Sequence, residues 1–325
     1  SIHTQYLYMT EVQLLEVSSD EDKVRLDRWV ANRFPSLGYR SVQKLLRTGQ
    51  VRVDGARAVG SLRLTVGQKI RVPPITESIG RTNKVKAELK GAELENLRSR
   101  ILYEDDQLLV LDKPPGLAVQ GGTGQSRHLA ELSKFLVASD IPAPKLVHRL
   151  DKDTSGVLVM AKTMAAARTF GKLFKSGKIR KTYWAVVVGI PFPLSGVMDN
   201  ILDKRMGPGG EKVTVTSDEG KPARTRYHTL DRKGTKAALV ALYPETGRTH
   251  QLRVHCVELG TPILGDGKYG GPNSFIKDLS SARRLHLHAR AIEFPTDDTK
   301  KLRVVAPLPY HMRESMVKLA LNPGE

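Results

Sequence analysis

The sequence predicts an α+β fold, in which a mixed, mainly antiparallel central sheet carries flanking helices and a small α/β module precedes it. From residue 101 onward, apolar strand-like runs follow one another with helical patterns scattered between them, unlike the regular alternation that builds a parallel sheet. Residues 21–75 form a unit of their own, bounded by the acidic stretch SSDED before it and by VPP and a polar segment after it. We therefore expect a module at 21–75, a linker at 76–99 and a large domain at 100–325.

The first unit predicts two helices followed by short strands. The segments 24–34 and 41–50 have apolar residues at helical spacing, whereas 51–55 and 66–72 alternate apolar and polar residues around glycine turns. Twelve lysines and arginines face only four acidic residues in this unit. Four of these cations fall on or just after the second helix, where they could follow a phosphate backbone: Arg40, Lys44, Arg47 and Arg52. A solvated helix face is the alternative interpretation.

The large domain predicts further strands and helices in a mixed order. The predicted strands are LLVLD (108–112), VLVMA (157–161), TYWAVVVG (182–189), ARTRYHTL (223–230), AALVALY (237–243), RAIEF (290–294) and KLRVVA (301–306). The predicted helices are 127–136, 164–176, 249–259 and 309–321. RMGPGGEK at 205–212 and the GPNS loop near 272 read as surface insertions.

Composition restricts the class of partner. The net charge of +18 favours a polyanion, usually nucleic acid and less often an anionic membrane. No apolar run approaches the roughly 18 residues of a membrane span, and no signal peptide with an apolar centre opens the chain, so we expect no membrane partner. A single cysteine, Cys256, cannot form an internal disulfide or a multi-cysteine zinc site.

Motifs for common cofactors are absent from the sequence. There is no GxxxxGK[ST] loop, no GxGxxG after a strand, no HExxH and no zinc-deaminase pattern. GGTGQS at 121–126 lacks the lysine and the strand-to-helix context of a phosphate loop, and His286 with His288 has no acidic neighbour to complete a metal site. We expect no metal, no nucleotide cofactor and no other cofactor.

One polar turn, HRLDKDTSG at 148–156, stands out because it leads straight into an apolar strand. Basic neighbours favour the charged form of a carboxylate there, which suits nucleophilic attack or proton abstraction. Asp151 and Asp153 could equally be turn formers that cap backbone N–H groups. A conventional glycosidase pair is disfavoured, because the basic surroundings would ionise both carboxylates.

The turn and three other blocks, in the same order, resemble the RluA-type pseudouridine synthases. HRLDKDTSGVLVMAKT resembles their signature, and LDKPPGLAVQGG (111–122), KTYWAVVVG (181–189) and TGRTHQLRVHCVELGTPILGDGKYG (246–270) resemble their further blocks. The resemblance covers residues 100 to 310 and implies the pseudouridine synthase fold. Separately, residues 21–75 resemble the alpha-L RNA-binding module of a ribosomal small-subunit protein and of tyrosyl-tRNA synthetases.

The resemblance implies a role for particular residues. Asp151 matches the catalytic aspartate, Arg149 the arginine that fills the gap left by a flipped nucleotide, and Tyr183 the aromatic ring under the uracil. Arg253 matches the arginine paired with the catalytic carboxylate, and Leu252 the wall of an apolar pocket. By sequence alone, Tyr183 could instead be a core tyrosine, Arg253 a surface cation and Leu252 a core leucine. Gln120 departs from the family, because many relatives have histidine there.

The resemblance implies an enzyme that isomerises uridine in structured RNA, with large-subunit ribosomal RNA or its assembly intermediate as partner. An RNA-binding ribosome-assembly factor that has lost activity is the alternative. We expect a monomer or a ribosome-associated protein. YWAVVVGIPFPLSGVMDN and LHLHAR resemble mitochondrial members, and the non-Met start suits a cleaved transit peptide, so we expect the mitochondrial matrix, with the bacterial cytoplasm as alternative.

Overall fold

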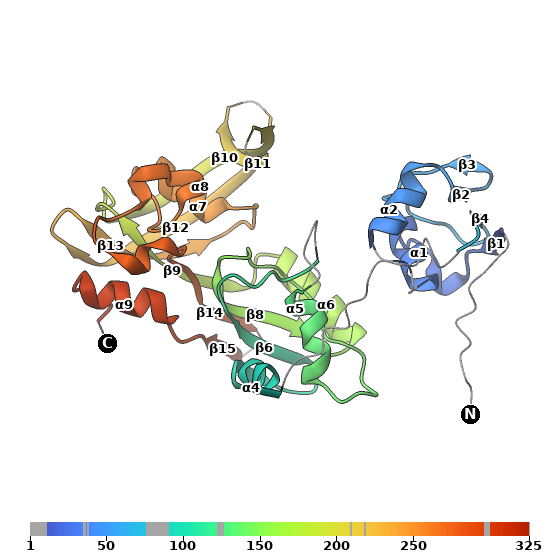
Figure 1. Cartoon of the computed structure of the whole chain (residues 1–325), viewed down its shortest axis with the longest axis horizontal. Coiled ribbons are helices and arrows are strands. Elements are labelled where there is room, and N and C mark those ends of the chain that lie inside the picture. Colours follow the sequence, from blue (N-terminus) through green and yellow to red (C-terminus); the bar gives the residue numbers. More distant parts are fainter. Residues whose placement is uncertain are drawn as a thin grey trace. The chain divides into compact units, whose positions relative to one another are not determined.

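A computed structural model describes residues 12–34, 37, 39–75, 91–121, 127–208, 210–217, 219–295 and 300–324. The chain divides into two compact units, Ser1–Lys86 and Ala87–Glu325 (Figure 1).

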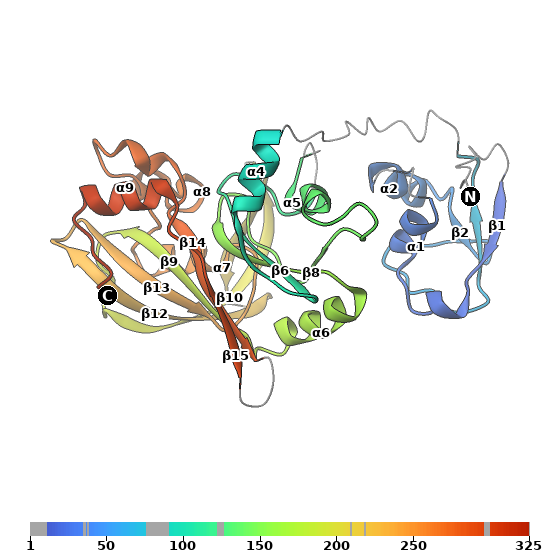
Figure 2. The same cartoon turned by 90° about the horizontal axis from the view of Figure 1, so that it is seen from below.

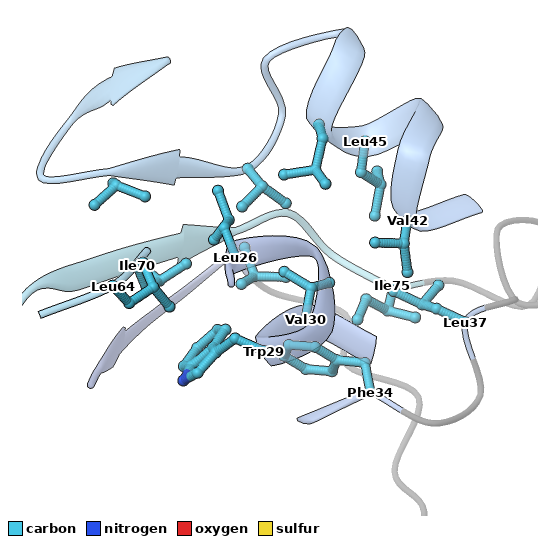
Figure 3. Packing of buried hydrophobic residues seen from close by; sticks show 14 of the residues in the cluster. Leu26, Trp29, Val30, Phe34, Leu37, Val42, Leu45, Leu64, Ile70 and Ile75 are labelled. Atoms are coloured by element: carbon cyan, nitrogen blue, oxygen red, sulfur yellow. The ribbon is translucent and has the colours of Figure 1, made fainter. Parts of the chain in front are cut away.

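The first unit packs two helices against a small sheet. Its elements are β1 (Gln13–Glu16), η1 (Ser19–Glu21), α1 (Leu26–Arg33), α2 (Tyr39–Arg47), β2 (Arg52–Val53), β3 (Ala56–Arg57) and β4 (Lys69–Val72), with strand order β1-β4-β2-β3. Leu26 and Trp29 of α1 are fully buried beside Leu64 and Ile70 (Figure 3). Because β1 pairs with β4, the unit extends further toward the N-terminus than the predicted start at residue 21.

The range 76–99, predicted as a linker, is partly helical. Gly91–Ser99 form helix α4, and Leu97 is buried in a cluster with Leu109, Leu129 and Leu158. Residues 91–99 therefore pack as part of the second unit, whereas 76–90 lie outside the described residues.

The second unit is built on one large sheet. Its strands are β5 (Ile101–Glu104), β6 (Leu108–Lys113), β7 (Lys145–Leu146), β8 (Ser155–Ala161), β9 (Arg180–Val188), β10 (Ser195–Gly207), β11 (Gly210–Thr216), β12 (Lys221–Lys233), β13 (Ala237–Pro244), β14 (Leu287–Pro295) and β15 (Lys301–Val305). The main order is β11-β10-β12-β13-β9-β14-β8-β6-β5, with β15 paired to β14 and β7 to β8. All described pairings are antiparallel except β14 with β8. The sheet is therefore mixed and mainly antiparallel, as predicted.

Helices cover both faces of this sheet. Alternate residues of a strand point to opposite faces, so each strand contacts helices on both sides. The helices are α5 (Leu129–Leu132), α6 (Met164–Lys175), α7 (Gln251–Glu258), α8 (Gly267–Gly270) and α9 (Tyr310–Lys318), with short 3-10 turns η2 (Ser133–Leu136), η3 (Gly271–Ser274) and η4 (Ser280–Arg283). On β8, Val157 and Val159 pack with α6, whereas Leu158 and Met160 pack with α4 and α5. Figure 2 shows α6 and α4 on opposite sides of β6 and β8.

Helices α7 and α9 divide the other end of the sheet in the same way. Val187 of β9 packs with Leu252 and Cys256 of α7, and Val186 packs with Met312 and Met316 of α9. None of the helices in the described ranges is long and apolar enough to cross a membrane.

Two segments predicted as surface insertions are more regular than expected. Residues 205–212 lie mostly in the antiparallel β10–β11 hairpin, which closes at the pair Gly207 and Gly210. The GPNS segment forms η3, and Ser274 within it is fully buried. Glycine-rich composition signals a turn, but only the pairing partner shows that the flanks are strands.

Candidate active site

The turn that contains Asp151 is fastened from several sides. Lys113 is fully buried and donates hydrogen bonds of 2.8 Å to the carbonyls of Pro114, Leu117 and Lys152. Burial lowers the pKa of Lys113 to about 7, with Asp153 and Asp151 acting in the opposite direction. Three carbonyl acceptors match the three N–H donors of an ammonium group, so these contacts favour the charged form. Lys113 thus holds the residue next to Asp151 in place.

His148 fixes the start of the same turn and is not a cation. The Val159 N–H donates to its Nε2 at 2.9 Å, and its ring stacks on Phe174 of α6 with 4.3 Å between centroids. Burial lowers the pKa of His148 to about 3, so the ring is neutral at physiological pH. The first residue of the HRLD motif therefore has a structural part in this turn.

Gly156 explains why the motif ends in glycine. Its φ is +109°, and a Cβ built there would lie 2.2 Å from the carbonyl oxygen of Ala289. This close approach is where β8 pairs in parallel with β14, and next to it Ser155 Oγ lies 2.8 Å from His288 Nδ1. Since His288 Nε2 faces the Ala306 carbonyl, which can only accept, Nδ1 accepts from Ser155. The Ser-Gly pair joins the turn to the neighbouring strand.

The sequence-predicted residues of the large domain meet in one cavity of about 350 Å³. Its wall includes Arg149, Asp151, Tyr183, Leu252 and Arg253, which come from the turn before β8, from β9 and from α7. Arg149 is exposed, Asp151 half-buried and Leu252 buried. A carboxylate, an aromatic ring and two arginines around an apolar wall can hold a flat base beside an anionic backbone.

Tyr183 belongs to β9 and is half-buried between two apolar clusters of the sheet. Burial, and secondarily the charge of Asp151, raise the pKa of Tyr183 above its ordinary value. The hydroxyl consequently stays protonated at neutral pH, and the ring is an uncharged surface for stacking. Gln120, where the sequence departs from the family, is exposed and does not line this cavity.

Arg253 pairs with a different carboxylate from the one expected. Its Nε and Nη2 donate to Asp266 at 3.0 and 2.6 Å, and its guanidinium lies 4.9 Å from the ring centre of Tyr269. The side chains of Arg253 and Asp266 are 9% and 0% exposed, so this bidentate pair is buried. Within ion-pair distance in the described ranges, the partner of Asp151 is instead His250, whose Nε2 is 3.8 Å from Oδ2.

His250 has an unusual backbone for a residue that is not glycine. It precedes α7 with φ 53° and ψ 19°, in the left-handed region. Its Nδ1 lies 2.5 Å from the hydroxyl of Tyr269, and that hydroxyl accepts the Val213 N–H at 3.2 Å. Burial lowers the pKa of His250, Asp151 opposes this, and Arg253 and Lys268 reinforce it. A neutral ring with its proton on Nε2 suits both neighbours, because Tyr269 can donate to Nδ1 while Asp151 can only accept.

The loop before α7 is held by Gln251. Its Oε1 accepts from the Thr246 hydroxyl at 2.7 Å and the Arg248 N–H at 3.0 Å, and its Nε2 donates to the Arg224 carbonyl and the Thr225 hydroxyl. All four hydrogen-bonding positions of this buried amide are thereby used. These contacts hold the residues on both sides of His250.

Sequence reasoning missed His250, Asp266 and Tyr269 as members of the site. All three lie within the block TGRTHQLRVHCVELGTPILGDGKYG, so the signal was present. Spacing alone could not show that Asp266, thirteen residues after Arg253, turns back onto it. Among the described residues, no group of three or more His, Cys, Asp or Glu side chains is arranged to hold a metal ion.

The cations predicted for the first unit belong to α2 and β2. Lys44 and Arg47 are exposed in the last turn of α2, and the side chain of Arg40 lies outside the described residues. Arg52 is exposed and pairs across the sheet with Arg57 and Arg71. Such a row of like charges is unfavourable by itself. The carbonyls of Gly49, Gln50 and Gly55 accept from Arg52 and Arg71 and offset part of this repulsion.

Comparison with known proteins decides the family. Residues 107–258 match the model for RNA pseudouridylate synthases. "Ribosomal large subunit pseudouridine synthase C" of Yersinia pestis is 36% identical over 321 residues, which cover 96% of this chain and 97% of the relative. The chain belongs to the RNA pseudouridylate synthase family.

Further family members agree over similar lengths. The proteins of the same name from Escherichia coli K12 and from Buchnera aphidicola of Schizaphis graminum are each 34% identical to this chain, over 95% and 94% of it. Among solved structures, human RNA pseudouridylate synthase domain containing 4 has 33% identity and a TM-score of 0.60, covering 70% of this chain and 96% of that one. The human domain containing 1 has 28% identity and a TM-score of 0.55, covering 68% and 87%. Family membership makes the cavity around Asp151 the candidate active site.

Proposed function

We propose that this pseudouridine synthase isomerises uridine to pseudouridine in structured RNA, with large-subunit ribosomal RNA as the substrate and no cofactor. The observation that carries the proposal is the single cavity that Asp151 shares with Arg149, Tyr183, Leu252 and Arg253. The choice of RNA rests on the names of the bacterial relatives, each a ribosomal large subunit pseudouridine synthase C.

The reaction needs a reacting group on the sugar side and a surface that retains the free base. The bond between C1′ and N1 breaks, C1′ joins C5, the proton on C5 leaves and N1 gains one. Asp151 acts at the ribose, either by attack on C1′ or by removal of a sugar proton. Tyr183 stacks under the uracil while it turns, since no covalent bond then holds it to the sugar. The isomerisation needs no oxidant or reductant, because uridine and pseudouridine have the same composition.

Arg149 acts on the RNA that the uridine leaves. The target must leave its stack because C1′ and C5 are poorly accessible inside a helix. An exposed, planar and permanently charged guanidinium can stack in the vacated position and reach a phosphate together. Leu252 forms part of the apolar wall of the cavity. Arg253, through its pair with Asp266, keeps α7 fixed beside Asp151.

His250 is a positioning residue for Asp151 in this proposal. A neutral imidazole that presents Nε2–H toward Oδ2 restricts the rotation of the carboxylate and leaves its negative charge in place. Tyr269 holds the other side of the ring. Orientation of the reacting carboxylate is thereby linked to the Val213 backbone of the β10–β11 hairpin.

In this proposal the first unit is an RNA-docking module. It contacts RNA through the exposed side chains of Lys44, Arg47 and Arg52, and through Arg40, which belongs to the same helix as Lys44 and Arg47. Replacement of Lys44 and Arg47 by glutamate should weaken RNA binding and reduce its salt dependence, while the rate on saturating RNA stays near that of the unchanged protein. We expect the protein to act as a monomer on ribosomal RNA or on an assembly intermediate. The curated relatives named above are bacterial, which supports action in the bacterial cytoplasm; nothing in the comparisons supports the mitochondrial matrix.

Release of tritium tests the proposed reaction directly. Unmodified large-subunit ribosomal RNA, transcribed with tritium at uridine C5, is incubated with the purified full chain. Isomerisation must release that tritium to water because C5 becomes the attachment point of the sugar. Release at a small number of mapped uridines supports the proposal, and absence of release with intact RNA binding contradicts it.

A further inference from the structure

A second and larger groove adjoins the site cavity. Its volume is about 1130 Å³, against about 350 Å³ for the cavity around Asp151. The two share part of their walls, including Phe174, Lys181 and Arg248. The groove extends from there along the end of α6, the start of β9 and strands β14 and β15. The larger groove is thus continuous with the place where the base would be held.

The walls of this groove carry more positive than negative side chains. Its cations are Lys175, Arg180, Lys181, Arg226, Arg248 and Arg303, and its acids are Glu245 and Glu293. Glu245 is already held by Arg224 and Arg226 at 2.9 and 3.0 Å, and Glu293 lies 3.5 Å from Lys301.

Five of these six cations, all except Arg226, have no carboxylate within ion-pair distance in the described part of the chain. Arg180 and Arg303 are two of them, and both side chains are exposed. Burial, and secondarily the charge of Arg303, lowers the pKa of Arg290, so a further cation lies close to Arg303. An anionic ligand in the groove would relieve this repulsion.

Lys181 lies between the two spaces. It is half-buried, its burial lowers its pKa, and it lines both the groove and the site cavity. Tyr243, also in the groove wall, carries the guanidinium of Arg226 at 5.7 Å from its ring centre. A row of cations with an aromatic side chain is the arrangement that follows a single nucleic-acid strand.

We propose that this groove, with Arg180 and Arg303 as its principal contacts, binds the phosphate backbone of the RNA strand on one side of the flipped uridine. The proposal rests on the proposed function, because it takes the Asp151 cavity as the place of the target base. The shared wall, which contains Lys181 and Arg248, gives a strand that enters the cavity a continuous path into the groove. Beyond them the groove offers Arg180 and Arg303 as exposed cations.

A charge-reversal pair tests the groove. Arg180→Glu with Arg303→Glu is compared with a matched pair, Arg232→Glu with Arg313→Glu, which changes the same charge at exposed arginines that do not line the groove. Binding of a labelled, uridine-rich RNA oligonucleotide is measured over a range of salt concentrations. We expect the groove pair to weaken binding at low salt by at least about tenfold and to reduce the salt slope by about two.

Three comparisons decide the outcome. If the groove pair and the control pair bind RNA alike, with the same salt slope, the groove proposal is wrong, whereas tritium release by the unchanged protein would still support the reaction. If the unchanged protein releases no tritium but the groove pair loses binding, the proposed reaction is contradicted, and the groove binds RNA without a reacting uridine beside it. Arg180→Lys with Arg303→Lys should recover most of the affinity, since phosphate contact needs charge more than shape; failure to recover it would contradict the proposal.

Discussion

His250 Nε2 lies 3.8 Å from Asp151 Oδ2, and Nδ1 of the same ring lies 2.5 Å from the hydroxyl of Tyr269. The backbone of His250 is in the left-handed region, which raises the conformational energy of a residue other than glycine. Strained backbones of this kind cluster at functional sites, where the surrounding structure holds them in place. The relationship connects a carboxylate on the turn before β8 with a tyrosine on α8.

Loss of the ring should slow the chemical step more than it weakens binding. His250→Ala frees the Asp151 carboxylate, and we expect kcat to fall by about tenfold to a hundredfold with KM nearly unchanged. His250→Gln, which retains an N–H donor, should recover part of the rate, and Tyr269→Phe should cause a smaller loss of kcat. Steady-state kinetics on ribosomal RNA measure this. A rise in KM with an unchanged kcat would instead assign His250 to RNA binding.

The buried pair of Arg253 and Asp266 should matter for stability as well as activity. Asp266→Asn leaves the guanidinium without its charged partner, and breaking a buried pair in this way costs about 3–5 kcal/mol. Asp151→Asn, at a side chain that is 30% exposed, should change the free energy of unfolding by much less. Urea denaturation followed by fluorescence compares the two. Equal destabilisation by both variants would mean that Arg253 depends on Asp151 after all.

Gly156→Ala should destabilise the second unit strongly. The added Cβ would meet the Ala289 carbonyl at 2.2 Å, so strands β8 and β14 would have to separate. Gly177→Ala is the matched control, since Gly177 also has a positive φ, +72°, but nothing lies within 4 Å of its Cβ position. We expect about 1 kcal/mol for the control, from backbone strain alone, and clearly more for Gly156→Ala. Similar losses would show that β14 can move away at little cost.

Acid should destabilise the second unit before its carboxylates titrate. Burial lowers the pKa of His148 to about 3, and burial also lowers the pKa values of His255, His286 and His288 to about 4, from an ordinary value of 6.5. The unfolded chain therefore binds protons at these residues below pH 6.5 while the folded chain does not, so stability falls as the pH drops from 6.5 toward 4. Each histidine contributes up to about 1.4 kcal/mol per pH unit. The free energy of unfolding, measured by urea denaturation between pH 7.5 and 4.5, should decline with proton uptake; a flat profile from 6.5 to 5 would contradict this.

The sequence predicts most of the fold because the apolar pattern changes with each element. The β8 strand and helix α6 both follow from local spacing. The β10–β11 hairpin does not follow from local spacing, because exposed strands carry few apolar residues. In β11 most positions are at least partly exposed, and only Val213 is buried. A possible short helix in KVKAELKGAELENL is visible in the sequence, but the polar, charge-mixed composition of 76–99 is typical of a linker, and only Leu97 along α4 is buried.

The candidate site is predictable to the extent that it is written in contiguous motifs. Asp151, Tyr183, Leu252 and Arg253 could be named from the sequence because each stands in a block that resembles the family. Their partners could not, because the contacts of Arg253 with Asp266 depend on how the chain folds back after α7. The neutral state of His148 is likewise a consequence of packing under Phe174, which its basic neighbours in the sequence do not reveal.

Mapping of pseudouridine with Asp151→Asn tests the central claim most directly. The substitution keeps the shape of the side chain and removes its charge, and the His250 ring can remain in place. We expect the variant to bind large-subunit ribosomal RNA as the unchanged protein does, and we expect pseudouridine at the target to disappear, both in cells and with purified components. Undiminished modification by the variant would contradict the assignment of Asp151. If the unchanged protein binds the RNA and supports ribosome assembly without modifying it, the alternative of an RNA-binding assembly factor is correct.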